Sequence, residues 1–232
     1  MPIEGILNTA RTLSFYERRQ EVTANNLANA SSDAFKADRV LAHTLPGSTA
    51  PVPVQDVDLQ QGAFRETARP LDVSLDGQGY FVVDTPRGER LTRGGSFRLD
   101  AQGRLADSQG NLVQGVDGPI VLAGGGKVVV QGDGTVEVDG ASAGRLRIVN
   151  VDEPVRMLKE GFGCYAPAGP LHPADENVTR VRQGAVEEAN LDPMLSMVDL
   201  VTIQRAFAAN VDALKAMDSV LGAVTTEVGK VA

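Results

Sequence analysis

The feature that most constrains the fold is an apolar heptad pattern close to the C-terminal end of the sequence. Its members alternate steps of three and four, and they are Leu200, Ile203, Phe207, Asn210, Leu214, Met217, Leu221, Val224 and Val228. This spacing predicts one long helix with an apolar seam along one side. Asp192 followed by Pro193 predicts where it begins, because Asp caps free N–H groups and Pro suits the first helical position. A helix over 193–228 would be about 50 Å long, too long for a small β domain to cover.

A second helix is predicted at the other end of the sequence. Between residues 2 and 30 the only helix-breaking residue after Pro2 is Gly5. Helical spacing relates Ile6, Ala10, Leu13, Gln20, Ala24 and Leu27, although this stripe is thin because several members are small or polar. Each helix needs a partner for its apolar side, and each is the nearest candidate for the other. We therefore expect the two ends to form one helical unit.

The middle of the sequence has the pattern of short strands and tight turns. Residues 71–75 and 135–139 alternate apolar and polar side chains, and 80–83 and 127–130 are short apolar runs. Gly132, Asp133 and Gly134 stand between two such segments, as in a hairpin. An Asp-x-x-Gly-x-Leu unit at 100–105 recurs at 107–112 and predicts two successive β-turns.

These patterns predict an α+β protein in which a coiled-coil-like helical domain holds an inserted all-β domain. The N-terminal helix (1–38) would pair with 190–232, and residues 39–70, with Pro46, Pro51 and Pro53, would form an extended linker. The β domain would occupy 71–182, and a linker and the C-terminal helix would occupy 183–232.

Charge and composition exclude several classes of function. The chain has 22 Lys and Arg against 30 Asp and Glu, a net charge of −8, which argues against nucleic-acid binding. Cys164 is the only cysteine, and His43 and His172 are the only histidines, so the sequence predicts no intrachain disulfide, no metal site and no cofactor. No apolar stretch has the length of a membrane span, and the first residues do not resemble a secretory signal peptide.

Several segments resemble a known family. They are Asn-Asn-Leu-Ala-Asn-Ala at 25–30 followed by 35–39, Gly-Tyr-Phe-Val-Val at 79–83, the stretch 91–100, Gln-Gly-Ala-Val-Glu-Glu-Ala-Asn-Leu at 183–191, and Gln-Arg-Ala-Phe at 204–207. In this order they are similar to the axial proteins of the bacterial flagellum, the rod and hook components. Segments 118–120, 134–136 and 144–149 are most similar to the proximal rod branch, and the alternatives are the distal rod branch or another rod or hook paralogue.

The resemblance implies a structural subunit without an active site. Terminal helices of many subunits would pack into a hollow tube that transmits torque, located in the flagellar basal body. The implied partners are copies of the chain, other rod and hook proteins and the flagellar type III export apparatus, which would export it without a cleaved signal peptide. No nucleic acid, membrane insertion or cofactor is implied. The residues we expect to carry subunit assembly are Ile6, Leu13, Asn25, Asn26, Leu27, Asn29, Leu200, Ile203, Phe207, Asn210, Leu214, Met217 and Leu221.

Other interpretations of the same residues stay open. Asn25, Asn26 and Asn29 could cap a helix end, or their amides could bond across subunits. Asn210 could be a solvated break in the seam or could fix its register. A hydrolase of the cell wall would need a pair of carboxylates flanking a cleft, for which the sequence offers only Asp133 with Asp139 and Glu187 with Glu188. A carbohydrate-binding β module with helical arms would explain the architecture but not the terminal motifs.

One departure from the family pattern bears on local structure. The family has Thr-Gly before Phe-Lys, whereas this chain has Asp33 and Ala34 before Phe35. A β-carbon disfavours the left-handed conformation, so we expect Asn29 or Asp33, rather than Ala34, to carry the bend after the first helix.

Overall fold

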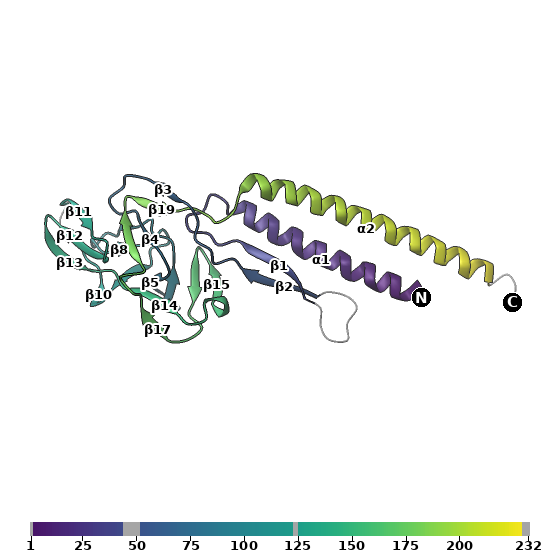
Figure 1. Ribbon diagram of the computed structural model, residues 1–232, viewed down its shortest axis with the longest axis horizontal. Helices are drawn as coiled ribbons and strands as arrows, with labels where there is room; N and C mark the ends of the chain where they lie inside the picture. Colours follow the sequence, from purple (N-terminus) through teal and green to yellow (C-terminus); the bar gives the residue numbers. More distant parts are fainter. Residues whose placement is uncertain (1, 44–51, 123–124, 229–232) are drawn as a thin grey trace. The chain divides into compact units, whose positions relative to one another are not determined.

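The computed structural model describes residues 2–43, 52–122 and 125–228 and divides into two compact units. Unit 1 consists of the described residues of 1–30, 38–58 and 191–232, and unit 2 consists of those of 31–37 and 59–190. Figure 1 traces the two terminal helices and the strands between them. The α+β class that the sequence predicts is confirmed, because two long helices flank a mainly antiparallel β region.

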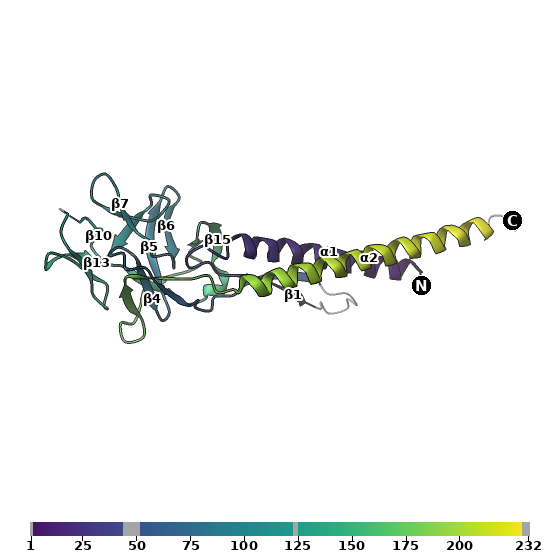
Figure 2. The same ribbon diagram turned by 90° about the horizontal axis from the view of Figure 1, so that it is seen from above.

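Two antiparallel helices form most of unit 1. Helix α1 spans Pro2–Ala28 and helix α2 spans Pro193–Val228. The Asp192 carboxylate accepts the N–H of Met194 at 2.8 Å, which confirms the predicted N-cap. Near the start of α1, the Thr9 hydroxyl lies 4.0 Å from the sulfur of Met217, close to the end of α2. Figures 1 and 2 both show the helices side by side, so each is the partner that the other needs.

A β-hairpin completes unit 1. Strand β1 (Asp38–His43) pairs antiparallel with β2 (Val52–Val57), and Leu41 lies opposite Val54. We expected an extended linker over 39–70, but this range contains the hairpin and a further strand. Pro53 lies opposite Ala42 in this pair. Its missing N–H is tolerated because β2 belongs to a two-stranded sheet, in which one edge of each strand makes no hydrogen bonds to another strand. Pro46 and Pro51 lie outside the described residues.

One large antiparallel sheet forms the body of unit 2. Its strands follow the order β15 (Leu158–Gly161), β16 (Cys164–Ala166), β6 (Gly88–Thr92), β5 (Tyr80–Thr85), β9 (Leu112–Gly115), β8 (Leu105–Ala106) and β7 (Arg98–Leu99). Three more strands join it, with β10 (Gly118–Pro119) on β9, β14 (Ile148–Val151) on β5, and β17 (Leu171–Pro173) on β14. A short 3-10 helix, η1 (Pro154–Arg156), precedes β15.

Unit 2 also contains three smaller sheets. They contain β11 (Val128–Val130), β12 (Thr135–Val138) and β13 (Ala141–Arg145); β18 (Arg180–Gln183) with β4 (Val73–Asp76); and β19 (Ala185–Glu187) with β3 (Phe64–Glu66). The β structure of the described residues therefore extends beyond the 71–182 that we expected, because β3 and β19 lie outside that range and pair with each other. The apolar alternation of 71–75 and the run 80–83 correctly indicated strands.

The core of unit 2 lies on both faces of strand β5. Phe81 and Val83 belong to one buried apolar cluster, and Tyr80 and Val82 belong to the other. Successive side chains of a strand point to opposite faces, so a strand buried on both faces requires a continuous apolar run. Gly95 approaches the backbone of Val73 so closely that a β-carbon there would lie 1.7 Å from the Val73 carbonyl oxygen.

The predicted turns are present. The N–H of Gly103 donates to the carbonyl of Asp100 at 3.1 Å, and Gly110 donates to Asp107 at the same distance. Gly134, with φ of 88°, lies in the turn between β11 and β12. These turns depend only on neighbouring residues, which explains why the sequence was sufficient to predict them.

The expected bend after α1 is wrong in one respect. Ala34 itself has φ of 55°, whereas neither Asn29 nor Asp33 has positive φ. The N–H of Ala34 donates to the carbonyl of Glu187 at 2.7 Å, and the side chain is buried. Because this hydrogen bond joins residues far apart in the sequence, it imposes a conformation that local preference opposes.

Candidate functional site

The predicted seam of α2 lies against α1. Ile203 is 2% exposed, whereas Leu200, Phe207, Asn210, Leu214 and Leu221 are partly buried and Met217 is exposed. On α1, Ile6, Leu13, Asn26, Leu27 and Asn29 are partly buried and Asn25 is exposed. The side chains of Val224 and Val228 lie outside the described part of the chain. The seam is therefore used within the chain, and it is only partly covered there.

The predicted amides make hydrogen bonds within the chain. Asn26 accepts the N–H of Asp38 at 3.0 Å and donates to its carbonyl at 2.8 Å, which fastens β1 to α1. The Asn29 amide donates to the carbonyl of Asn25 at 2.9 Å, as a residue at a helix end does. The Asn210 amide donates to Ala206 on its own helix at 2.8 Å. Asn26 thus holds unit 1 together, and Asn210 bonds to its own helix rather than to α1.

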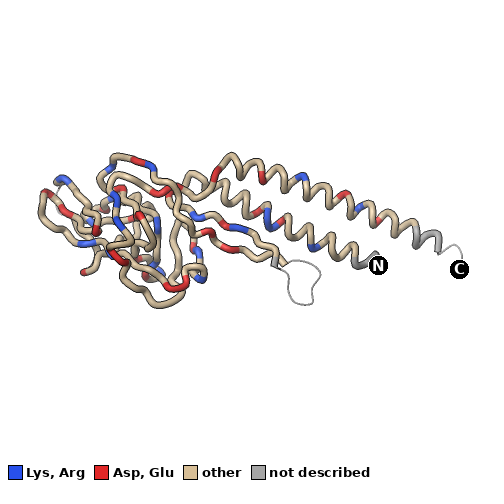
Figure 3. Tube along the Cα trace, in the orientation of Figure 1, with Lys and Arg blue, Asp and Glu red and all other residues tan. Residues whose placement is uncertain are grey.

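An exposed apolar face lies on the other side of α2, and sequence reasoning missed it. We define the outer α2 face by five exposed side chains in the first three turns, which are Met194 (77% exposed), Leu195, Met197, Val198 and Val201. At 3.6 residues per turn, four of them lie about a third to half a turn from Ile203 in the seam, and Leu195 lies about a quarter of a turn from it. Asp199 is the only charged residue between Pro193 and Gln204, and Figure 3 shows how sparse charge is along α2. This face has its own helical spacing, because positions 194, 197, 198 and 201 are related by steps of three and four. The longer heptad pattern on the other side of the helix obscured it.

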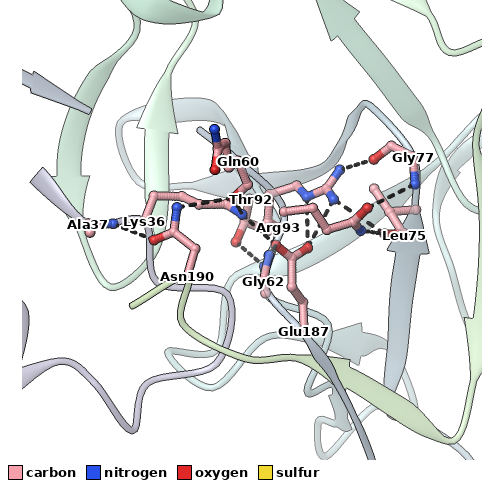
Figure 4. A network of polar contacts seen from close by, with 12 residues as sticks. Lys36, Ala37, Gln60, Gly62, Leu75, Gly77, Thr92, Arg93, Glu187 and Asn190 are labelled. Atoms are coloured by element: carbon pink, nitrogen blue, oxygen red, sulfur yellow. Dashed lines mark hydrogen bonds and ion pairs between the residues drawn. The ribbon is translucent and has the colours of Figure 1, made fainter. Parts of the chain in front are cut away.

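A buried ionic network lies within unit 2 (Figure 4). The carboxylate of Glu187, at the end of β19, is 1% exposed and forms ion pairs with Lys36 and with Arg93, at 2.9 Å for Arg93. Lys36 also donates to the carbonyl of Gln60 at 2.6 Å, and the N–H of Gly62 donates to Glu187 at 3.1 Å. Arg93 donates to three backbone carbonyls, those of Leu75, Gly77 and Gly79.

The network gathers segments that border unit 2. Lys36 lies in the segment after α1, Glu187 precedes the start of α2, and Gln60 follows the hairpin of unit 1 in sequence. Asn190 adds to these ties, because its side chain accepts the N–H of Ala37 at 2.8 Å and donates to the carbonyl of Gln60 at 3.1 Å. The segments from which the chain leaves unit 2 are thus fixed to one another.

Burial makes this network costly to break. Moving charges out of water is unfavourable unless their hydrogen bonds are replaced, and here one carboxylate receives two cations and a backbone N–H. Removing one partner would leave a buried charge without compensation, at a cost of about 3 to 5 kcal/mol. Burial also raises the pKa of the neighbouring Tyr80 phenol, although Arg93 opposes this effect.

The carboxylates that a hydrolase would need are engaged elsewhere. Asp133 accepts the backbone N–H and the hydroxyl of Thr135, and these hydrogen bonds lower its pKa, whereas a general acid needs a raised one. Asp139 accepts the N–H of Lys127 at 2.8 Å, and Glu188 pairs with Arg65 at 3.3 Å.

Within the described ranges, no three His, Cys, Asp or Glu side chains gather as a metal would require. Among the helices of the described residues, none is both long and apolar enough to cross a membrane.

Comparison with known proteins places these features in a family. Residues 74–138 match the flagellar hook protein FlgE/F/G D1 domain, and residues 182–227 match the C-terminal region of the flagellar basal body rod FlgEFG proteins. The flagellar basal-body rod proteins FlgF of Mesorhizobium japonicum and of Rhizobium meliloti are 30% and 33% identical to this chain. These alignments cover 82% and 85% of the chain and 83% and 86% of the relatives.

A related rod protein is also similar. The flagellar basal-body rod protein FlgG of Bacillus subtilis is 25% identical over 89% of this chain and 92% of its own length. The second matched region contains the outer α2 face, and Arg93 lies in the first while Glu187 lies in the second. The resemblance noted in the sequence is thereby confirmed, and with it a structural rather than an enzymatic role. The chain belongs to the flagellar basal-body rod protein family.

Proposed function

We propose that the chain is a subunit of the proximal rod and assembles with copies of itself and with other rod and hook subunits through the outer α2 face. The single observation that carries this proposal is the row of five large apolar side chains exposed on one side of α2. Identities of 30% and 33% to FlgF proteins, against 25% to an FlgG protein, support the proximal rod over the distal rod.

The outer α2 face has the properties of a helix-packing surface. Burying one Val, Leu or Met side chain contributes about 1.5 to 3 kcal/mol, so several together can offset the entropy lost on association. The described α1 covers the opposite side of α2, which leaves this face available to helices of neighbouring subunits. In a tube of many subunits the seam residues and the outer α2 face would both be buried, the former within a subunit and the latter between subunits.

The buried network would supply the mechanical link that a torque-transmitting rod requires. It fixes the segments that leave unit 2, so a force reaching these segments acts on the packed β region rather than on loose loops. Hydrogen bonds from Lys36, Arg93 and Gly62 converge on the one carboxylate of Glu187. This arrangement resists separation of the segments in several directions.

Delivery through the flagellar type III export apparatus is part of the same proposal. Passage through a narrow channel requires a largely unfolded chain, and Cys164, the only cysteine, cannot form an intrachain disulfide that would hamper it. The expected location is the rod of the basal body.

The test is incorporation into basal bodies of a strain that lacks the native protein. Val198→Asp places a charge on the outer α2 face and should abolish incorporation and motility, while the β region keeps its thermal stability. Gln204→Glu adds the same charge at an exposed polar position of the same helix and serves as the matched control, with incorporation close to the wild type. Normal basal bodies containing Val198→Asp would overturn the proposal, as would absence of the unmodified chain from basal bodies.

A further inference from the structure

The turn between β15 and β16 displays an aromatic side chain in an unfavourable backbone conformation. Phe162 and Gly163 form the two-residue turn and have φ of 52° and 73°, the pattern of a type I′ hairpin. Asn, Asp and Gly suit the first position of this turn, whereas a bulky residue with positive φ is an outlier. Phe162 is also 80% exposed, so burial in its own chain does not offset the strain.

Two further apolar side chains are exposed in the residues that precede this turn. Val155 in η1 and Leu158 at the start of β15 are both strongly exposed. β15 is the terminal strand of the large sheet, so its outer edge has no neighbouring strand among the described residues. Three large apolar side chains exposed within eight residues are more typical of an interaction site than of an ordinary surface.

The hairpin that carries Phe162 is firmly anchored in unit 2. Glu160 on β15 pairs with Arg90 at 2.9 Å and with Arg87 at 3.1 Å. The adjacent Lys159 ammonium donates to the carbonyl of Lys36 at 2.5 Å and lies 4.6 Å from the centre of the Phe35 ring. The position of Phe162 is thus fixed before any partner binds, which reduces the entropy lost on docking.

A cleft of complementary character exists elsewhere in unit 2. It measures about 370 Å³, and its apolar wall is made by Val116, Ile148, Leu171, Pro173 and Ala174. The guanidinium groups of Arg145 and Arg147 border it, held by ion pairs to Glu176 and Glu89, and Asp133, Glu176 and Thr179 also line it. The apolar wall together with the guanidinium groups suits an aromatic ring, because Arg is attracted to the face of such a ring.

We propose that Phe162 of one copy docks in this cleft of a second copy. The cleft is lined by residues of β13, β14 and β17 and by neighbouring loops, and none of its lining residues lies on β15 or β16, so the hairpin and the cleft are different surfaces of unit 2. A contact between two different surfaces is heterologous and leaves a free hairpin and a free cleft for further copies. This inference rests on the proposed assembly function and adds a contact between β regions to the contact between helices.

The first test separates docking from folding. Phe162→Asn removes the aromatic ring and places a residue suited to the turn, so the melting temperature of the full-length protein should be unchanged or higher. Incorporation of Phe162→Asn into basal bodies should fall at least severalfold. Phe162→Trp keeps an aromatic ring and should be incorporated close to the wild-type level. Val121→Asn is the control. It makes an apolar-to-Asn change at an exposed position of unit 2 outside the hairpin and the cleft, and it should incorporate normally. Normal incorporation of Phe162→Asn would contradict the proposal.

The second test identifies the partner. The photoreactive residue p-benzoylphenylalanine is placed at position 162, where it keeps an aromatic ring, and isolated basal bodies are irradiated. A cross-link between two copies that joins position 162 to the cleft beside Ala174 would support the proposal. Cross-links to another surface or to a different protein, or incorporation of the variant without any cross-link, would each overturn it. Absence of even the unmodified chain from basal bodies would instead refute the proposed rod function.

Discussion

Unit 1 and unit 2 bury their apolar side chains to very different extents. Among the described residues of unit 1, Val22 and Ile203 are the buried apolar side chains, although its two helices together span 63 residues. Unit 2 has two apolar clusters, one on each face of β5. Their large side chains Phe81, Phe97 and Tyr165 are fully buried. Unit 2 therefore has a core of its own, whereas most apolar side chains of the helices in unit 1 are partly buried or exposed.

This difference matches a division of roles within a rod subunit. A surface that joins subunits must stay available until assembly, so it cannot be buried within the chain that carries it. The core of the β region completes its packing within the chain, although the hairpin that carries Phe162 stays exposed. The helices gain most of their stability from packing of their apolar faces rather than from helix propensity.

The largest effect on stability is expected in unit 2. Glu187→Gln replaces the carboxylate that pairs with Lys36 and Arg93 by a neutral amide, and should lower the free energy of unfolding of the β region by about 3 to 5 kcal/mol. Chemical denaturation followed by tyrosine fluorescence measures this loss. Glu188→Gln changes the adjacent, more exposed carboxylate and should cost under about 1 kcal/mol. Equal losses in the two variants would show that burial does not determine how much the network contributes to the free energy of unfolding.

A smaller effect is expected in unit 1. Phe207→Asp places a charge in the partly buried seam and should destabilise the helix pair by about 2 to 3 kcal/mol. Helical circular dichroism should fall, while the melting of the β region should stay within error of the wild type. A parallel loss of β structure would mean that the two units unfold together, and the comparison would fail.

A gain of stability is expected at the bend after α1. Ala34→Gly should raise the free energy of unfolding by about 1 kcal/mol or less, because glycine adopts the observed φ of 55° without strain but leaves a small cavity and gains unfolded-state entropy. Ala37 is also buried but does not have positive φ, so Ala37→Gly should be destabilising. Thermal melts of both variants decide the matter. A loss of stability in Ala34→Gly comparable to that in Ala37→Gly would show that strain at Ala34 is negligible.

The smallest effect concerns the only cysteine. Burial, helped by Asp107 and Glu160, raises the pKa of the Cys164 thiol, so the folded state favours the neutral form. Its contribution to stability is complete below the ordinary thiol pKa and is lost as pH rises through the folded value. At pH 8 a thiol reagent should react about tenfold or more slower with the folded chain than with the unfolded chain. Rapid labelling of the folded chain would reveal an opening of the β core that the packed unit does not predict.

The sequence predicted the features that depend on local pattern. The long helices, the Asp192 cap, the turns at Asp100 and Asp107 and the strand at 80–83 each follow from spacing or from residues within one turn. The residues predicted to carry assembly came mainly from the strongest periodic pattern. That pattern led to the surface between α1 and α2, and the outer α2 face stayed hidden because a helix with two apolar sides gives no single clear stripe.

Features that depend on distant residues could not be predicted. Lys36, Arg93 and Glu187 are separated by 57 and 94 positions, and nothing in their neighbours indicates that they meet. The conformation of Ala34 depends on a hydrogen bond to Glu187, and the pairing of β3 with β19 joins two segments that were both predicted to be linkers. In each case the folded β region, rather than local preference, decides the outcome.

The most direct test of the central claim is hydrogen exchange in the isolated chain and in basal bodies. We predict that amides of β5, β6 and β9 exchange equally slowly in both, since unit 2 has its own core. Amides of α2 should exchange at least a hundredfold faster in the isolated chain, with the outer α2 face among the segments that gain most protection on assembly. Equal protection of α2 in both states, or β strands that become protected only after assembly, would contradict the account.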